Sequence, residues 1–226
     1  MRRPAEEYDI VEPKYSFSYT LTPYGVTASP RRPSFFSAVE LRHLAIAVAA
    51  LTVAFTLVLY NGDTASIPYF LGLAALSVFA GFLIHEMAHK FLARKYGCWA
   101  EFRADYRGLA IALLLSIFGF LFAAPGAVYI SGNVTREQNG KISLAGPGSN
   151  LAIATLCLPF AMLTIEGLPT FVGDVAYSLY FFSTFLAIFN MIPIFPLDGS
   201  KVWAWNKPIY IASMAAAVLM FVLAWL

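Results

Sequence analysis

Long apolar runs dominate this sequence of 226 residues and restrict the folds open to it. Five of the runs have about the 20 residues that an α-helix needs to cross a hydrocarbon core roughly 30 Å thick. Because a bilayer offers no water to backbone N–H and C=O groups, only helices and closed barrels can span it. With 59% hydrophobic and 12% charged residues, we expect an α-helical integral membrane protein with about five to six transmembrane helices. The apolar runs cover residues 44–60, 68–90, 109–130, 143–165, 171–195 and 208–226.

The positions of the basic residues predict how these helices are oriented. All 15 lysines and arginines lie in the segments 1–42, 90–107, 136–141 and 201–207, and none lies in the connectors 61–67 and 166–170. Since basic loops favour the cytoplasmic side, we expect a multi-pass cell-membrane protein with a cytoplasmic N-terminus. The basic residues are neither clustered nor interleaved with aromatic residues, so the sequence gives no support for nucleic-acid binding.

The run 109–130 has basic residues on both sides and should therefore leave and re-enter on the same face of the membrane. Gly119 and the segment 124–126, which is Ala-Pro-Gly, would break a helix in this run. Such backbone is tolerated at membrane depth where it is buried against protein or lines a wet cavity. We therefore predict a re-entrant element; the alternative is a sixth spanning helix at 109–123.

The N-terminal residues 1–42 are mostly polar and include five prolines. Within them, aromatic and leucine residues alternate with serine and threonine over 15–21, which is strand periodicity. The sequence thus divides into a cytoplasmic N-terminal segment, 1–42, with a strand at 15–21, and a membrane domain, 43–226.

The motif His85-Glu86-Met87-Ala88-His89 ends the second apolar run. On a helix His85 and His89 are one turn apart on the same face, so both imidazoles can bind one metal ion. Glu86 lies roughly 100° around the helix, where it can act on a metal-bound water. An ionisable residue within a membrane helix costs about 2.5–3.5 kcal/mol on insertion scales, which favours a functional glutamate.

Asp198 is the best candidate for a third metal ligand. In the predicted topology the span before Asp198 and the span of the histidines run in the same direction. Asp198 lies three residues before Lys201 and His89 lies one residue before Lys90, so we expect all three side chains at a similar depth near the cytoplasmic face. Two imidazoles and one carboxylate leave the fourth position of a zinc ion open, as in catalytic zinc sites. Pro193 and Pro196 would break the helix ahead of Asp198 and let its short side chain reach inward. The alternative is that the pair 198–199, Asp-Gly, forms only a turn.

The sequence resembles the site-2 protease family of intramembrane zinc metalloproteases over about residues 68–200. HEMAH at 85–89, GPGSN at 146–150 and NMIPIFPLDG at 190–199 are similar to the three motifs of that family. The resemblance implies a three-helix catalytic core over 68–95, 143–165 and 171–195. It also implies one Zn²⁺ per chain held by His85, His89 and Asp198, with Glu86 as general base, and a small membrane-associated β element within 120–130.

Peptide hydrolysis also needs a donor for the oxyanion and a way to hold the substrate extended. Asn190, as a catalytic residue, and Asn150, as a substrate-binding residue, are the candidate donors; both could instead form hydrogen bonds that only hold helices together. An exposed strand edge within 120–130 could bind the unwound substrate by β-addition, interrupted at Pro125 and Gly126.

These features predict an intramembrane zinc metalloprotease that cleaves single-span transmembrane proteins near the cytoplasmic side, in regulated intramembrane proteolysis. One alternative is a catalytically idle, zinc-stabilised membrane scaffold that binds transmembrane partners, but an intact Glu86 argues against it. A metal transporter is the third possibility, yet it would repeat polar residues along several spans, and here they cluster at one depth.

Overall fold

The computed structural model describes residues 17–22, 25–30, 34–121, 124–165 and 170–223, which form two separate units, Met1–Phe36 and Ser37–Leu226. In the first unit, β1 (Phe17–Thr22) pairs antiparallel with β2 (Gly25–Pro30), and Phe17 lies opposite Pro30. β1 overlaps the segment in which alternation predicts a strand, whereas residues 15 and 16 lie outside the described residues.

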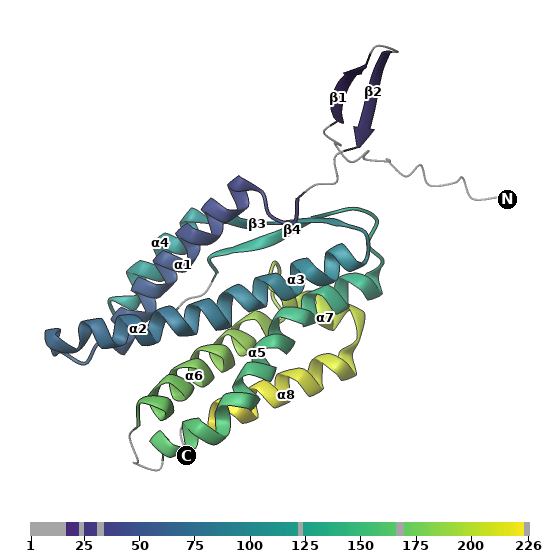
Figure 1. The fold of residues 1–226 in the computed structure, drawn as a ribbon. Helices are drawn as coiled ribbons and strands as arrows, with labels where there is room; N and C mark the ends of the chain where they lie inside the picture. Colours follow the sequence, from purple (N-terminus) through teal and green to yellow (C-terminus); the bar gives the residue numbers. More distant parts are fainter. Residues whose placement is uncertain (1–16, 23–24, 31–33, 122–123, 166–169, 224–226) are drawn as a thin grey trace. The chain divides into compact units, whose positions relative to one another are not determined.

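Helix α1 (Ala38–Leu59) opens the second unit (Figure 1). The Ser37 hydroxyl accepts a hydrogen bond from the Glu40 N–H, which caps the first turn. The helix therefore begins several residues before the apolar run at Leu44. The predicted division at residue 42, between an N-terminal segment and a membrane domain, stays a prediction.

The motif His85–His89 lies in one continuous helical rod, visible in Figure 1 as α2 running into α3. The rod comprises η1 (Thr64–Ser66), α2 (Ile67–Ser77), the π-helical segment η2 (Val78–Leu83) and α3 (Ile84–Lys95). It ends where Gly97 takes a positive φ of 82°, a conformation that favours glycine.

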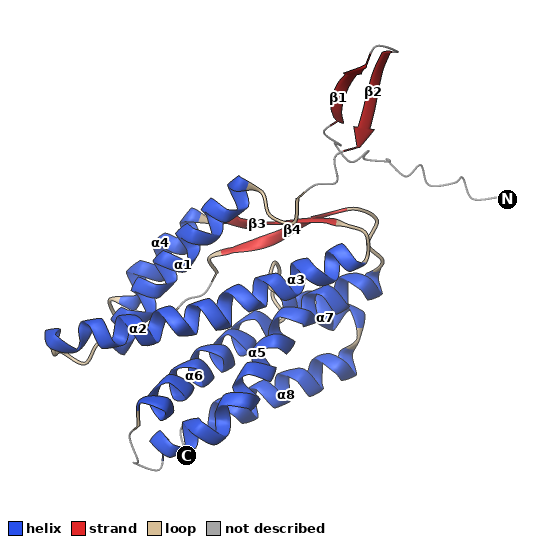
Figure 2. Ribbon diagram, viewed as in Figure 1, coloured by secondary structure: helices blue, strands red, loops and turns tan. Residues whose placement is uncertain are grey.

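A two-stranded antiparallel sheet and a short helix follow the rod (Figure 2). They are β3 (Trp99–Ala104), α4 (Tyr106–Ser116) and β4 (Gly126–Ser131), with Trp99 opposite Ser131. The run 109–130 is thus part helix, part turn and part strand. A single spanning helix at 109–123 is not formed, because α4 has 11 residues, about 16 Å, and Gly119 follows it with a φ of 78°.

Four further helices complete the second unit: α5 (Arg136–Ile165), α6 (Phe171–Met191), α7 (Asp198–Trp205) and α8 (Lys207–Leu223). α6 ends at Met191 and not at the predicted residue 195, because Pro193 and Pro196 cannot continue it. α7 was not predicted, since its 8 residues carry too little apolar periodicity to be distinguished from a connector.

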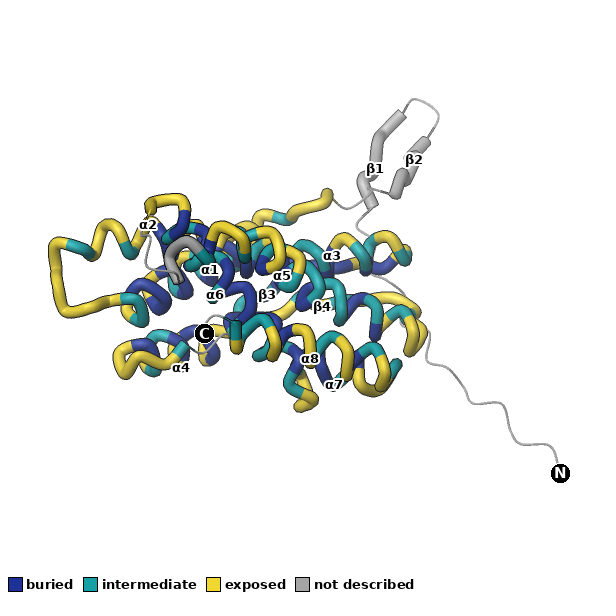
Figure 3. The backbone as a smooth tube through the Cα atoms, turned by 90° about the horizontal axis from the view of Figure 1, so that it is seen from below, coloured by how far each residue is buried: buried dark blue, intermediate teal, exposed yellow. Residues whose placement is uncertain are grey.

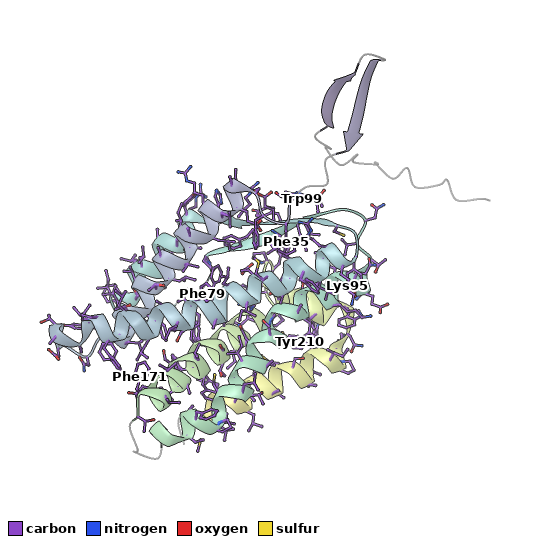
Figure 4. All side chains as sticks on the ribbon, in the orientation of Figure 1. Phe35, Phe79, Lys95, Trp99, Phe171 and Tyr210 are labelled. Atoms are coloured by element: carbon purple, nitrogen blue, oxygen red, sulfur yellow. The ribbon has the colours of Figure 1, made fainter. Side chains whose placement is uncertain are left out.

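Among the described residues, four helical stretches are long and apolar enough to cross a membrane: Ala38–Leu59, Thr64–Lys95, Arg136–Met162 and Phe171–Met191. α8 is apolar but has 17 described residues, so the predicted total of five to six spans stays a prediction. Large apolar side chains remain exposed on these helices, as Phe79 (60%) and Phe171 (68%) illustrate in Figure 4. Such surface is unusual for a protein in water and suits contact with lipid.

The interior is built mainly by α1, the α2–η2 segment and α6. Leu51, Phe55, Val78 and Phe182 are buried there in one cluster. Figure 3 shows buried and exposed residues alternating along the helices, as expected when one side of each helix packs inward.

Candidate metal centre

His85, His89 and Asp198 come together in a buried cluster, as the sequence predicts. Their potential ligand atoms all lie within 4.8 Å of one another. The distances from Asp198 Oδ2 are 3.0 Å to His89 Nε2 and 3.5 Å to His85 Nε2, and the two Nε2 atoms are 3.0 Å apart. Ligands held about 2.0–2.1 Å from a tetrahedral zinc are about 3.3 Å from one another, so the three residues fit this metal.

Asp198 reaches the histidines because α7 starts directly against the end of α6. It is the first residue of α7, after the bend that contains Pro193 and Pro196. Gly199 makes this close approach feasible, since a Cβ there would lie 2.1 Å from the Met191 carbonyl oxygen. Burial alone would raise the pKa of the Asp198 carboxyl, but the charge on His89 and hydrogen bonds from both imidazoles hold this pKa below its usual value. These contacts favour the ionised carboxylate of Asp198, which is the form that binds metals.

Helix α5 also packs against the cluster. The His89 Nδ1 atom lies 2.7 Å from the Ile142 carbonyl oxygen, which can only accept a hydrogen bond, so Nδ1 donates. This contact leaves His89 Nε2 as the ring atom that could bind a metal. Gly146 faces both rings, and a Cβ there would lie 2.3 Å from His89 Nε2 and 2.6 Å from His85 Nε2. The space for a metal ion thus depends on a glycine.

Glu86 lies beside the ligands on α3 and is 7% exposed. Its Oε2 atom is buried and has no hydrogen-bond partner among the residues that the structure describes. A buried carboxylate oxygen without a hydrogen-bond partner is costly. The position of Glu86 Oε2 therefore suits a hydrogen bond from a water or a substrate group bound beside the cluster.

The two predicted asparagines occupy different places. The Asn190 amide, half-buried near the end of α6, donates to the Leu186 carbonyl oxygen of its own helix at 3.0 Å. Asn150 is fully buried, and its Nδ2 atom lies 3.1 Å from His85 Nδ1.

Pro125 and Gly126 lie at the start of β4, a strand that packs against α3. The Pro125 carbonyl accepts a hydrogen bond from the Asp105 N–H at 2.9 Å. Gly126, opposite Ala104, has a φ of 152°, and a Cβ there would lie 2.2 Å from the Arg103 carbonyl oxygen. Both residues therefore shape the sheet; their predicted role in binding substrate stays a prediction.

Comparison with known proteins places this chain in a family. The protein named "Putative zinc metalloprotease MJ0611" of Methanocaldococcus jannaschii is 42% identical over 178 residues, which cover 77% of this chain and 88% of that protein. This chain belongs to that zinc metalloprotease family. The resemblance to site-2 proteases drawn from its motifs is confirmed.

Two further members of the family align over shorter stretches. "Zinc metalloprotease MJ0392" of the same organism is 29% identical over 128 residues, 55% of this chain and 31% of that protein. "Putative zinc metalloprotease Rip3" of Mycobacterium tuberculosis is 30% identical over 138 residues, 59% of this chain and 31% of that protein. No family model and no solved structure matches the chain.

Proposed function

We propose that this protein is an intramembrane zinc metalloprotease that hydrolyses peptide bonds of single-span transmembrane proteins near the cytoplasmic side of the membrane. The observation that carries the proposal is the position of the buried cluster His85, His89 and Asp198. Two of these residues, and Glu86 with them, lie in Thr64–Lys95, a helical stretch long and apolar enough to cross a bilayer.

Each residue of the cluster has a distinct part in hydrolysis. One zinc ion bound by the two histidines and Asp198 would supply the Lewis acid that activates water and polarises the peptide carbonyl. Glu86, with its unpaired buried Oε2, accepts the proton of the attacking water and later delivers it to the leaving amine. The Asn190 side chain uses one amide hydrogen for the Leu186 carbonyl and offers the second to the oxyanion.

The proposed topology follows from charge and from the metal site together. α3 and α7 both carry candidate ligands of one metal, so these ligands lie at one depth. Both helices also contain basic residues: Lys90 and Lys95 in α3, and Lys201 in α7. The positive-inside rule then assigns this depth to the cytoplasmic side and the N-terminus to the cytoplasm.

α4 would enter this side of the membrane without crossing it. The residues after the helix are strongly exposed and apolar, with Ile117 and Phe118 each 68% exposed and Phe120 66% exposed. Lipid contact would bury these side chains at no cost in unsatisfied polar groups. A helix of 11 residues that enters and leaves on the same side is consistent with the predicted re-entrant element.

A substrate helix must be unwound before its carbonyls can be attacked. The sheet of β3 and β4 has two strands in the described part of the chain. On the outer edge of β3, the N–H groups of Phe102 and Ala104 donate to side chains of α1, so an added strand would pair with β4. The edge of β4 is the better site because β4 packs against α3, which carries the metal ligands. Pro125 lacks an N–H and would end the pairing at the start of β4.

The direct test is cleavage of single-span substrates by the detergent-purified protein, with and without a zinc chelator, and beside the Glu86→Gln variant. We expect products from the zinc-loaded wild type only, and restored cleavage when zinc is added back. Zinc-independent cleavage would contradict the proposal. A zinc-loaded protein that binds substrates without cutting them would favour the idle scaffold.

A further inference from the structure

The π-helical segment η2 lies directly before the helix that carries the motif His85–His89. In a π-helix each N–H bonds to the carbonyl five residues earlier, whereas in an α-helix it bonds to the carbonyl four residues earlier. One extra residue is therefore held within the turn. Because an α-helix rotates by about 100° per residue, this residue shifts the face of everything after it by about 100°.

The buried residues of the rod repeat every four residues, which is more than one α-helical turn. A row with this repeat drifts by about 40° at each step around a straight α-helix. All buried residues of the rod fall into two such rows on neighbouring positions: Leu73, Ser77, Gly81, His85, His89 and Ala93 in one, and Ala74, Val78, Phe82, Glu86 and Lys90 in the other.

Two contacts show which directions the rod must face at once. In α2, the Ser77 hydroxyl lies 2.8 Å from the Ser178 hydroxyl of α6, and both are buried. In α3, His85 and His89 face Asp198 at the start of α7. Because α5 packs against both α6 and α7, these helices form one group, and the same side of the rod must carry Ser77 and the two histidines.

The π-helical turn brings these three residues to one side. His89 follows Ser77 by 12 residues, which places the two about 120° apart on a straight α-helix. With one residue absorbed in η2, the difference falls to about 20°. For His85, which follows Ser77 by 8 residues, the difference falls from about 80° to about 20°.

Gly81 is the residue of η2 that allows this turn to lie directly on α6. A Cβ at this position would lie 2.7 Å from Phe182 Cδ1 and 3.3 Å from Ser183 Oγ. Phe182 is fully buried in the central hydrophobic cluster, so its ring cannot easily move aside. The close approach of the widened turn therefore depends on the absence of a side chain at position 81.

We propose that η2, with Gly81, is a positioning element of the metal centre: it turns His85 and His89 towards Asp198 while α2 stays packed on α6. The proposal rests on the proposed function, because it concerns the ligands of the metal assigned there. A rod with one residue fewer in η2 would be a straight α-helix. It could keep the contact between α2 and α6 or the metal-binding cluster, but not both.

Deletion of Ala80, a half-buried residue of η2, tests the proposal when α2 is locked to α6. Ser77→Cys together with Ser178→Cys, in a background without the two native cysteines, should form a disulfide, since the two hydroxyls are 2.8 Å apart. The locked protein with an intact η2 should bind zinc as wild type does. The locked deletion variant should bind zinc at least about 100-fold more weakly, because the histidines then point about 100° away from Asp198.

Unchanged zinc affinity in the disulfide-bonded deletion variant would overturn the proposal and leave the metal site intact. A locked protein with an intact η2 that binds no zinc would also overturn it, because the two contacts would not coexist. A deletion variant that keeps its zinc but no longer forms the disulfide would support it. A wild-type protein that binds no zinc would overturn the metal site of the proposed function as well.

Substitutions at Gly81 test the same element without changing the length of the chain. Gly81→Ala should weaken zinc binding by about 10–100-fold, because the added methyl group meets the ring of Phe182. Phe182→Leu in the Gly81→Ala chain removes that ring and should restore most of the loss. Gly72→Ala, in α2, meets nothing within 4 Å and is the matched control.

The visible spectrum of Co²⁺ bound in place of zinc reports how the ligands are arranged, which a change in stability alone would not alter. We expect an altered spectrum for Gly81→Ala and the wild-type spectrum for Gly72→Ala. Wild-type zinc affinity and an unchanged Co²⁺ spectrum in Gly81→Ala would overturn the positioning role of Gly81.

Discussion

The Lys90 ammonium and the Glu40 carboxylate form an ion pair in which both side chains are fully buried. Lys90 follows the candidate metal ligand His89, and Glu40 lies in the first turn of α1. The second carboxylate oxygen of Glu40 accepts a hydrogen bond from the Phe102 N–H of β3 at 3.0 Å. One carboxylate thus joins α1, α3 and the sheet.

Removal of either partner of this pair should destabilise the fold strongly. Lys90→Met leaves a buried carboxylate, and Glu40→Ala leaves a buried ammonium, so we expect a loss of about 3–5 kcal/mol for each. The double variant should lose clearly less than the sum of the two. Unfolding in detergent measures this, and the exposed pair of Lys141 and Glu137 is the control, since its disruption should leave stability unchanged. Single variants as stable as wild type would show that the pair does not hold the three elements together.

Gly146→Ala should abolish zinc binding. A Cβ at this position would lie 2.3 Å from His89 Nε2, where contact distances are about 3.5–4.0 Å, so the rings or α5 would have to move. Gly148→Ala, two residues further along α5, meets nothing within 4 Å and is the matched control. Elemental analysis of both purified variants gives the zinc content. Full occupancy in Gly146→Ala would mean that α5 does not pack on the histidines as described.

Glu86→Gln should keep the bound zinc and the fold but lose activity. The amide cannot take a proton from water, and general bases typically contribute about 10²–10⁴ in rate. Cleavage of a single-span substrate, followed by gel densitometry, measures the loss. Activity within about tenfold of wild type would rule out Glu86 as the base.

Asp198→Ala should lose zinc as well as activity. Two imidazoles alone provide an incomplete site, whereas three protein ligands are usual for catalytic zinc. Zinc content should fall in Asp198→Ala and remain in Asn190→Ala, which we expect to lose turnover only. One tightly held zinc per chain in Asp198→Ala would exclude this carboxylate as the third ligand.

A cysteine introduced in place of Asn139 should react with a membrane-impermeant thiol reagent from the cytoplasmic side only. Asn139 is exposed in the first turns of α5, just beyond the predicted re-entrant element. The substitution Ala65→Cys, in the connector before α2, should be labelled from the opposite side. Both experiments need a background without Cys98 and Cys157. Labelling of position 139 from outside would mean that the chain crosses the membrane between α3 and α5.

The sequence by itself predicted the cluster of His85, His89 and Asp198 and the outlines of the long helices. His85 and His89 were accessible to this reasoning because residues i and i+4 share a face on any α-helix, whatever surrounds it. The long apolar stretches were accessible because the length of a spanning helix depends on bilayer thickness alone. Asp198 could be matched to the histidines by its place relative to neighbouring basic residues.

Other features were decided only by how helices far apart in the chain pack together. The sequence did not predict the strand β3 that pairs with β4, the buried contact between Glu40 and Lys90, or the position of Gly146 against both rings. The sequence presents Asn150 as one polar residue on an apolar helix, equally suited to substrate binding or to helix packing. The tertiary structure alone brings its amide to His85 Nδ1, because α5 and α3 meet at that turn, and hydrogen bonds act only over about 3 Å.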